Sequence, residues 1–441
     1  MFKIRQRKFM RMTTMLLSSL VIAVFSSTVA LSAERIQIEH LVAPSWGQLA
    51  FETYTQIAEI FNKKQDRIEV HVVMGTGNYE ELVMTRLLGG APPDVITSNK
   101  LADLAPKGIL RSLTEFAERD DVIGDLLPPA VEQCTWDGEL LMLPQVAQPF
   151  VTYYNPFLFA QSGIADPYTQ FKAGGWDWEA VSASARKISR DIDNNGVLDI
   201  WGTGIPVNWQ QRTILWVVQA GGKYFDRWVN PTKATYDSPE VVTALTFIKS
   251  MIETNAMPLE GALGSTGNRN FIAGKTGMVF EGTWQIGNNR NGGFYDWDLA
   301  PVAKGPANAG TIMQIDGLQM LQAAPHPEES WEWMKFLVTD PEAYALFTRA
   351  TGRSPAVLRG LQTYLQVIVE DGKPVHVDAV ANAMMNPIIG PCIPIVSNVS
   401  AMGNIFGTEI PKYLRNEQSL QVSLLKINEV AAQTIKAALG L

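Results

Sequence analysis

The sequence predicts an α/β protein of two lobes, each built on a mostly parallel sheet flanked by helices. Near the N-terminus, residues 36–38, 68–72 and 93–96 carry apolar side chains in the runs and alternations typical of strands. Residues 51–61 and 79–87, which lie between these strands, repeat apolar side chains at helical spacing. Because parallel neighbours need a crossover connection, usually a helix, this order indicates a mostly parallel sheet.

Chain length is the reason for expecting two lobes. The chain has 441 residues and a hydrophobic content of 46%. A single core stops growing at roughly 250–300 residues. The sequence therefore predicts two lobes, and its apolar content is ample for two cores.

Residues 1–33 have the composition of a secretory signal peptide. Five basic residues precede an apolar run over residues 15–25, and small residues follow around Ala30 and Ala33. No cysteine lies near the expected cleavage site, so we expect an exported protein without a lipid anchor. We find no second run of about 18 apolar residues, the length that a spanning helix needs. The mature chain is therefore expected to be soluble outside the cytoplasm.

The net charge argues against a nucleic-acid partner. At pH 7 the whole chain carries a formal charge of -8, and removal of the basic signal peptide would make it more negative. Proteins that bind nucleic acid instead concentrate lysine and arginine on one face. We therefore expect no nucleic-acid partner.

Two cysteines, Cys134 and Cys392, lie far apart in the sequence. In an oxidising compartment they could form a disulfide bond or stay as buried thiols. No spacing rule supports a bridge, so unpaired thiols are the favoured interpretation.

Further along, the chain continues to mix helices with short strands. Residues 143–163 predict an extended, proline-flanked segment that passes into a strand and then a helix, as in a connection between lobes. Helical patterns follow at 238–253 and 328–346, with strand-like pieces between 297 and 321. Residues 419–439 predict a terminal helix that packs through one apolar face.

The segment from Phe271 to Trp284 points to a ligand-binding position. It predicts a short helix, a Gly-Lys-Thr-Gly turn, an apolar strand and then a tryptophan just past the strand. Ligands of α/β proteins gather beyond the carboxyl ends of strands, so Trp284 is a candidate contact residue. A half-buried tryptophan that only packs against the core is the alternative.

The turn in this segment matches a nucleotide-binding loop only in part. Gly274, Lys275 and Thr276 supply the end of the pattern G-x-x-x-x-G-K-[ST], but Arg269 stands where its first glycine should be. We therefore expect no ATP site here.

Two further pairs of residues follow predicted strands. Ser45 and Trp46 come after the first strand, and Ser98 and Asn99 come after the third. At the carboxyl edge of a parallel sheet these residues would lie near a ligand. Each pair could instead form an ordinary helix cap or turn, and capping is the favoured role for Asn99.

Six motifs, taken in order, carry a resemblance to a known family. They are GGAPPDV (89–95), DGELLMLP with VTYYNPFLF (137–144 and 151–159), GWDWEAVSASARKI (175–188), FIAGKTGMVFEGTW (271–284), DWDLAPVAKGP (296–306) and TGRSPAV (351–357). These motifs occur in the order found in that family and span nearly the whole mature chain. By them the sequence resembles the extracellular solute-binding proteins of ABC importers. The resemblance is to the sugar-binding group that includes maltose-binding protein.

The resemblance implies a two-lobed, periplasmic-binding-protein-like type II fold whose lobes are joined by a hinge of several chain crossings. Residues 34–147 and 318–350 would form the N-terminal lobe, and residues 150–315 and 353–441 the C-terminal lobe. The crossings would fall near residues 145–149, 315–317 and 352–353. It also implies a monomeric periplasmic protein that closes around a small-molecule carbohydrate and delivers it to an inner-membrane ABC permease.

A carbohydrate offers apolar C–H faces and a rim of hydroxyl groups, so its site needs aromatic rings together with planar polar groups. By its place in the family pattern, Trp284 would stack on the sugar, and Trp209 and Gln211 would form a second contact. Trp46 and Asn99 would face them from the N-terminal lobe. Core packing is an alternative role for Trp209.

Residues in the three crossings complete the expected site. Asp316 and Arg353 could bind sugar hydroxyls or simply hold the hinge. Gln148 stands where the family often places a carboxylate, and this difference argues against a maltose-like preference. The expected ligand-binding set is therefore Trp46, Asn99, Gln148, Trp209, Gln211, Trp284, Asp316 and Arg353.

A phosphorylated polyol such as glycerol-3-phosphate is the alternative ligand. It would need a cationic subsite, for which Arg353, Arg212 and Lys100 are the candidates.

An exported hydrolase is the rival class of protein. The sequence contains neither an H-E-x-x-H nor a G-x-S-x-G pattern. The carboxylate pair of a glycosidase is a spatial arrangement, which a sequence does not display. We expect a binding protein with no catalytic residues.

Asp191, Asp193, Asn195 and Asp199 follow the order of the first positions of a calcium-binding loop. Position 12 of such a loop is Gly202 here instead of a bidentate glutamate. A plain turn rich in Asp and Asn is the favoured interpretation, with weak calcium binding as the alternative. We expect no other cofactor.

Overall fold

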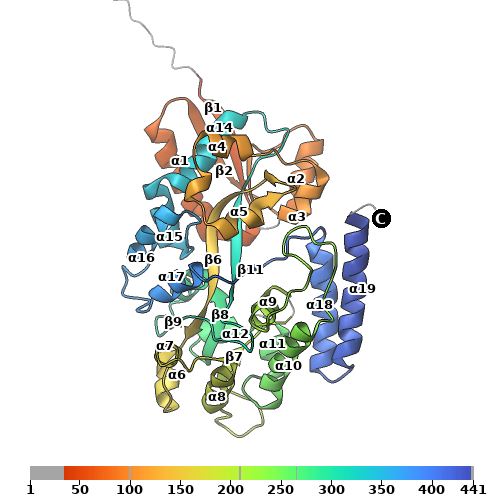
Figure 1. Cartoon of the computed structure of the whole chain (residues 1–441). Coiled ribbons are helices and arrows are strands. Elements are labelled where there is room, and N and C mark those ends of the chain that lie inside the picture. Colours follow the sequence, from red (N-terminus) through yellow and green to blue (C-terminus); the bar gives the residue numbers. More distant parts are fainter. Residues whose placement is uncertain (1–33, 99–100, 208–209, 265, 439–441) are drawn as a thin grey trace, which may run out of the picture. The chain divides into compact units, whose positions relative to one another are not determined.

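One mixed sheet runs through the part of the chain that the computed structural model describes, residues 34–98, 101–207, 210–264 and 266–438. Its strands lie in the order β2, β1, β3, β10, β6, β8, β7, with β11 beside β10 and β9 beside β6 (Figure 1). They are β1 (Ile36–Val42), β2 (Ile68–Met74), β3 (Val95–Ser98), β6 (Leu143–Tyr154), β7 (Trp201–Gly204), β8 (Thr276–Gly282), β9 (Asp298–Ala300), β10 (Thr311–Gln319) and β11 (Ile389–Pro391). A separate hairpin pairs β4 (Thr135–Trp136) with β5 (Glu139–Leu140).

Strand directions divide the sheet into two halves, which meet at β6 and β10. In the first half, β1 runs parallel to β2 and β3, whereas β10 is antiparallel to β3. In the second half, β7 runs parallel to β8, whereas β6 is antiparallel to β8. Each half is therefore mostly parallel with one reversed strand, and this confirms the predicted fold class.

β6 and β10 belong to both halves of the sheet. β6 pairs with β10 over residues 143–149 and with β8 over residues 150–154. β10 pairs with β11 at its start and with β3 at its end. Both strands are buried along their whole length, as expected where helices cover both faces of a sheet.

Helices follow the first strands as the apolar spacing predicts. α1 (Gln48–Lys64) follows β1, and α2 (Tyr79–Leu88) follows β2. α1 presents Tyr54, Ile57 and Phe61 to the core. Asn78 caps α2, because its side chain accepts a hydrogen bond from the backbone amide of Glu81.

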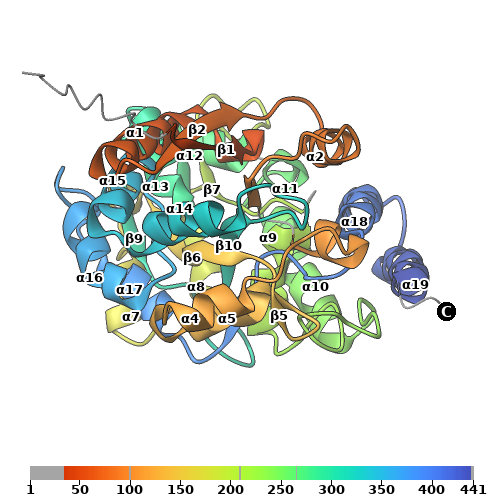
Figure 2. The ribbon, with the colours of Figure 1, turned by 90° about the horizontal axis from the view of Figure 1, so that it is seen from above.

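The predicted helix over residues 328–346 is two helices in the structure, α14 (Pro327–Thr339) and α15 (Pro341–Thr351). Pro341 lacks the amide hydrogen that a continuous helix would use. The carboxylate of Asp340 instead accepts hydrogen bonds from the backbone amides of Glu342 and Ala343, so a new helix begins there. α14 packs against β1, β6 and α1 (Figure 2).

The remaining helices complete the two halves. They are α3 (Leu101–Leu104), α4 (Thr114–Arg119), α5 (Pro128–Cys134), α6 (Pro156–Gln161), α7 (Pro167–Lys172), α8 (Trp178–Ile188), α9 (Gln210–Gln219), α10 (Pro239–Glu253), α11 (Leu259–Leu263), α12 (Thr266–Ile272), α13 (Trp284–Asn291), α16 (Leu358–Val367), α17 (Asp378–Met384), α18 (Val399–Leu414) and α19 (Leu420–Ala438). α10 begins as predicted, with Ser238 as its cap. α18 and α19 pack side by side (Figure 1, Figure 2).

Two clusters of buried side chains form the hydrophobic cores. Tyr54 and Trp331 belong to the first cluster, and Trp216 belongs to the second. The first cluster also takes in side chains from residues 271–299 and 356–384. The clusters therefore do not follow the predicted lobe ranges, and that division of the chain stays a prediction.

Cys134 and Cys392 are buried and unpaired, as the sequence predicts. Cys134 ends α5, and Cys392 directly follows β11. Burial raises the pKa of the Cys392 thiol to about 12. A thiol that stays protonated is a poor nucleophile, so this residue serves as a small apolar side chain.

Candidate functional site

Three chain crossings lie side by side in the middle of the sheet. β6 and β10 pair there over residues 143–149. The third crossing follows α15 and also contacts β6. The amide of Ala147 donates to the carbonyl oxygen of Ser354 (3.0 Å), and the amide of Ala356 donates to that of Gln145 (2.9 Å). The three predicted crossings are therefore neighbours in space.

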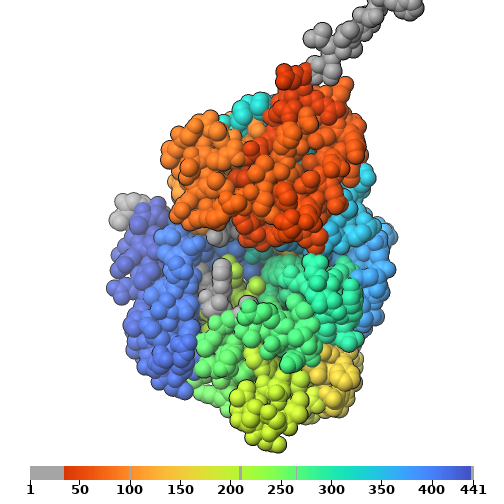
Figure 3. All heavy atoms as spheres, turned by 180° about the vertical axis from the view of Figure 1, so that it is seen from behind, coloured from red at the N-terminus to blue at the C-terminus, as the bar shows by residue number. Residues whose placement is uncertain are grey.

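A cavity of about 590 Å³ opens beside these crossings, between the strand ends of the first half and α9 of the second. Seen from behind, the surface is hollowed between the red and orange residues and the green and blue residues (Figure 3). Every described residue of the predicted binding set lines it: Trp46, Gln148, Gln211, Trp284, Asp316 and Arg353. The two other members, Asn99 and Trp209, lie outside the described residues, as does Lys100.

Asp316 forms the polar floor of this cavity with two glutamine amides. Its carboxylate accepts hydrogen bonds from Gln148 Nε2 (2.7 Å) and Gln314 Nε2 (2.6 Å). Burial raises the pKa of Asp316, although the Arg353 guanidinium and the two amides oppose this. Among the described residues, Gln148 Oε1 is buried without a hydrogen-bond partner. The floor therefore keeps hydrogen-bonding capacity for a ligand.

Arg353 connects the third crossing to the loop after β1. Its Nη2 donates to Trp46 O (3.2 Å), and its guanidinium carbon lies 4.9 Å from the centroid of the Trp46 ring. The rings of Tyr54 and Phe347 contact that indole in turn. Arg353 Nη1 and Trp46 Nε1 are buried and have no acceptor within the described part of the chain. Both residues line the cavity, so a bound ligand could supply the missing acceptors.

Trp284 forms the opposite wall, and as predicted it lies just past the end of β8, where it begins α13. Gly282 makes room for its ring, because a Cβ atom at Gly282 would lie 2.1 Å from Trp284 Cζ3. The Arg212 guanidinium lies 5.3 Å from the Trp284 ring centroid and pairs with the buried carboxylate of Glu281 at 3.1 Å. Phe150 meets the indole edge-on. Trp284 is half-buried, so part of its surface faces the cavity.

The segment before Trp284 has the predicted order of helix, turn and strand. α12 ends before Gly274, which takes a positive φ of 72°, and β8 begins at Thr276. Glycine adopts this left-handed conformation without a steric penalty. The Gly-Lys-Thr-Gly turn is a tight connection between a helix and a strand.

The family model for bacterial extracellular solute-binding proteins matches residues 45–344. This match covers more than half of the chain and includes the loop after β1, β6, β8 and β10. The chain belongs to this family. The family consists of binding proteins, not enzymes. No helix in the described residues of this solute-binding protein is long and apolar enough to cross a bilayer.

Solved structures of other solute-binding proteins share its two-lobed fold. The substrate-binding protein Lmo0181 of Listeria monocytogenes has 23% identity and a TM-score of 0.75, over 92% of this chain and 100% of its own. The cyclic α-maltosyl-1,6-maltose binding protein of Arthrobacter globiformis has 18% identity and a TM-score of 0.72, over 92% and 100%. MalE of Xanthomonas citri has 16% identity and a TM-score of 0.74, over 91% and 98%. No curated protein matches the chain.

A second cavity of about 380 Å³ adjoins the first in this solute-binding protein. It lies between the start of α1 and one face of α13. Five residues line both cavities: Trp46, Gly47, Trp284, Asn288 and Arg353. The two tryptophans and the arginine of the predicted set therefore stand where the cavities meet.

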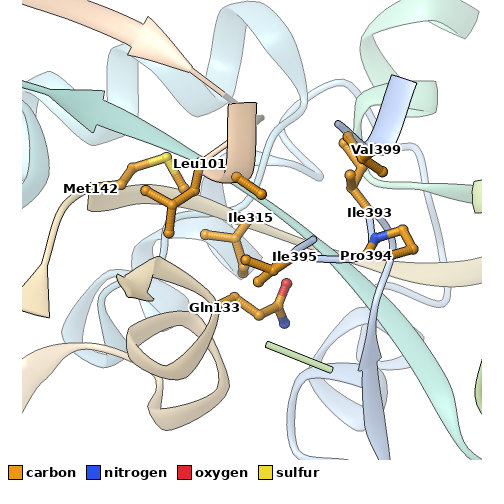
Figure 4. A pocket seen from close by; sticks show the side chains of 9 residues that line it. Leu101, Gln133, Met142, Ile315, Ile393, Pro394, Ile395 and Val399 are labelled. Carbon is orange, nitrogen blue, oxygen red and sulfur yellow. The ribbon is translucent and has the colours of Figure 1, made fainter. Parts of the chain in front are cut away.

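A third, small cavity beside β10 is lined mainly by apolar side chains, with Gln133 as the polar one, and it shares Ile393 with the first cavity. Its volume is about 20 Å³, which is room for roughly one water molecule. Figure 4 shows Leu101 and Met142 on one side of it and Ile393 on the other, with Ile315 of β10 beside them. Because side chains alternate along a strand, Ile315 and Asp316 project to opposite faces of β10. Ile315 therefore lines this small cavity, whereas Asp316 lines the polar one.

The loop after α8 brings three carboxylates together. Oxygen atoms of Asp191, Asp193 and Asp199 lie within 4.8 Å of one another. They accept hydrogen bonds from backbone amides of the same loop, including Gly196 N to Asp191 (2.7 Å) and Ile192 N to Asp199 (2.7 Å). Such bonds are those of a turn rich in Asp and Asn, which the sequence favours over a calcium loop.

Among the residues that line or support the site and were not predicted, three have a clear role. Gln314 donates a hydrogen bond to Asp316, Glu281 forms an ion pair with Arg212, and Asn288 lines both large cavities. The alternation of side chains along β10 is the signal that places Gln314 on the same face as Asp316. Glu281 interrupts an apolar strand, and a buried carboxylate requires a partner. No sequence signal singles out Asn288.

Proposed function

We propose that this solute-binding protein captures a carbohydrate in the 590 Å³ cavity and delivers it to the permease of an ABC importer. The observation that carries the proposal is the presence of two tryptophans on opposite walls above a floor of planar polar groups. Trp46 and Trp284 offer apolar ring surface, while Gln148, Asp316 and Arg353 offer hydrogen-bonding groups. This combination suits the C–H faces and the hydroxyl rim of a sugar.

Proteins with the same fold support a carbohydrate ligand. The Listeria protein was solved in complex with cycloalternan. The Arthrobacter protein is named for the cyclic α-maltosyl-1,6-maltose that it binds. Because the identities are low, these ligands support the class of compound and not a particular sugar.

Within the cavity, Trp284 is assigned the stacking role and Gln211 a hydrogen-bonding role on the same wall. Trp46 faces them from the first half, and Asp316 and Arg353 hold hydroxyl groups at the floor. Asn99 and Trp209 keep the contact roles that the family resemblance implies. Gln148 stands where the family often has a carboxylate, which favours a ligand other than maltose.

The charges around the cavity favour a neutral sugar over a phosphorylated polyol. Arg212 is paired with Glu281 at 3.1 Å, and Arg353 lies close enough to Asp316 to affect the pKa of that carboxyl. Both carboxylates are buried. A phosphate group would bring its negative charge close to two buried acidic groups, and such repulsion is strong in a site of low dielectric. Glycerol-3-phosphate is therefore the weaker candidate.

Capture follows from rotation of the two proposed lobes about the three crossings, residues 34–147 with 318–350 against residues 150–315 with 353–441. The ligand favours the closed form, because only there do both walls contact it. In this proposal residues 1–33 direct export, the mature protein is a periplasmic monomer without a lipid anchor, and the permease recognises the closed form.

A thermal-unfolding screen tests the ligand class. Sugars, polyols and sugar phosphates are added in turn to the mature protein, and a ligand that binds only the folded state raises the melting temperature by mass action. We expect neutral sugars to raise it and glycerol-3-phosphate to leave it unchanged. A shift with glycerol-3-phosphate alone would overturn the carbohydrate assignment, and steady release of sugar product would overturn the binding role.

A further inference from the structure

We infer that the carbohydrate is an oligosaccharide of at least two sugar units, with one unit in each of the two adjoining cavities. The inference rests on the proposed function and extends it, because it assigns the length of the ligand and the residues that contact its second unit. The cavity of about 590 Å³ is called the floor cavity below, and the cavity of about 380 Å³ the side cavity.

Each of the two cavities has the volume of a ligand pocket. Ligand pockets commonly measure about 300–1,000 Å³. The floor cavity at about 590 Å³ and the side cavity at about 380 Å³ each fall within this range. A monosaccharide would occupy one of them and leave the other to water. A ligand that spans both would bury more of its surface and contact both walls.

The junction between the cavities suits a chain of sugar rings. Trp46 comes from the first half, Trp284 from the second and Arg353 from the third crossing, and all three line both cavities. The two indole rings and the guanidinium group are planar. The two sugar rings that a glycosidic linkage joins can therefore each lie against one of these flat surfaces. Asn288 also lines both cavities and adds an amide at the junction.

The side cavity has a polar lining of its own. Gln48 and Glu52 line it from the start of α1, and Asn291 lines it from the end of α13. Gln48 Nε2 donates to Glu52 Oε1 (2.9 Å), which orients the carboxylate and leaves it further acceptor positions. Amides and a carboxylate can donate to and accept from sugar hydroxyls, whereas an apolar aglycone would gain nothing from them. The second unit is therefore a sugar.

Calorimetric titration with ladders of defined length tests the inference. Each ladder contains a monosaccharide with its disaccharide and its trisaccharide. One ladder is glucose, maltose and maltotriose, and the others are built in the same way from mannose, galactose and xylose. In the ladder that binds, we expect the disaccharide to bind at least about tenfold more tightly than the monosaccharide, which corresponds to about 1.4 kcal/mol. Equal affinity of the two would overturn the inference and leave the proposed function standing. If no member of any ladder binds and no sugar raises the melting temperature in the screen, the proposed function itself fails.

Substitutions in the side cavity locate the second unit. Glu52→Ala and Asn291→Ala are expected to remove most of the advantage of the disaccharide, and to leave the affinity for the monosaccharide unchanged. Glu59→Ala is the matched control, because Glu59 lies on the same helix with an exposed side chain and lines neither cavity. Variants that bind the disaccharide as tightly as the control would overturn the assignment of the side cavity.

Discussion

Arg353 Nη2 donates a hydrogen bond of 3.2 Å to the carbonyl oxygen of Trp46, and its guanidinium lies over the ring of the same residue. The two residues are 307 positions apart in the sequence. One belongs to the third crossing and the other to the loop after β1. The contact therefore orients a cationic group of the third predicted crossing against a ring that is anchored in the core of the first half.

The first prediction concerns this arginine. Arg353→Lys keeps the positive charge near Asp316 but loses the planar guanidinium, which lies over the Trp46 ring and whose unpartnered Nη1 is proposed to donate to the ligand. We expect the affinity for the carbohydrate to fall by about 10-fold to 100-fold, since one or two hydrogen bonds of about 1–2 kcal/mol are lost. Calorimetric titration measures the change. Arg349→Lys is the control, because Arg349 pairs with Glu370 on the surface. Similar affinities of the two variants would contradict the assigned role.

The second prediction concerns Gly282. Gly282→Ala places a methyl group where the ring of Trp284 now lies, so the indole must move although it is itself unchanged. We expect this variant to lose carbohydrate affinity roughly tenfold, as Trp284→Ala does, because both remove the ring from its position. Trp228→Ala is the control for loss of a half-buried indole outside the cavities. Full affinity in Trp284→Ala would reject the stacking role.

The third prediction concerns the pH dependence of binding. Burial raises the pKa of Asp316, so this carboxyl takes up a proton at a higher pH than an exposed aspartate does. Protonation removes an acceptor from the floor, and affinity is therefore expected to decrease as pH falls through that raised pKa. Asp316→Asn should bind about 10-fold to 100-fold more weakly, as expected for loss of a charged acceptor, and should lack this pH dependence. A variant with the same pH profile as the parent would exclude Asp316 as the titrating group.

The fourth prediction concerns the stability of the first half. His40 is fully buried, its Nδ1 accepts a hydrogen bond from Trp333 Nε1 (3.2 Å), and burial lowers its pKa from 6.5 to about 3. Between these values the unfolded state binds a proton that the folded state does not. The free energy of unfolding should therefore decrease as pH falls from 6.5 towards 3, by up to about 1.4 kcal/mol per pH unit.

Urea unfolding at a series of pH values measures this effect. His40→Asn keeps an acceptor for Trp333 without a titrating imidazole, so its stability should fall less steeply over the same pH range. His71→Asn is the control, because His71 is exposed on β2. An unchanged slope in His40→Asn would show that another group causes the acid sensitivity.

The fold could be predicted from the sequence where local periodicity is strong. β1, α1, β2 and α2 occur where alternation and helical spacing predict them, because each element has one face in a core. The division into α14 and α15 at Asp340 also has a local cause, the Asp340 cap and Pro341. The apolar pattern continues across this point, and it therefore predicts one helix instead of two. The pairing of β6 with both halves is not a local property: the sequence indicates only that residues 143–163 connect two lobes, and the family resemblance places a crossing near residues 145–149.

The candidate site could be predicted in part for a related reason. Trp284 and Arg353 lie in motifs whose order carries the resemblance, and both line the floor cavity. Asn288 and the side cavity depend on how α13 lies against the start of α1, and no pattern within either helix encodes that distance. The ion pair between Glu281 and Arg212 also depends on the tertiary fold, because the two residues are remote in sequence.

β6 and β10 run through both halves of the sheet, and Gln148 and Asp316 lie near their midpoints. Points on an axis of rotation move least, so in the proposed hinge motion these two side chains hold almost the same position whether the lobes are apart or together. Hydrogen bonds from these two side chains to a sugar would therefore stabilise the open and the closed forms nearly equally. Such bonds cannot by themselves shift the equilibrium towards the closed form. The signal that a ligand is present must therefore come from the moving walls, where Trp46 and Trp284 approach each other. Substitutions at the floor should weaken occupancy, whereas substitutions at the walls should uncouple occupancy from closure.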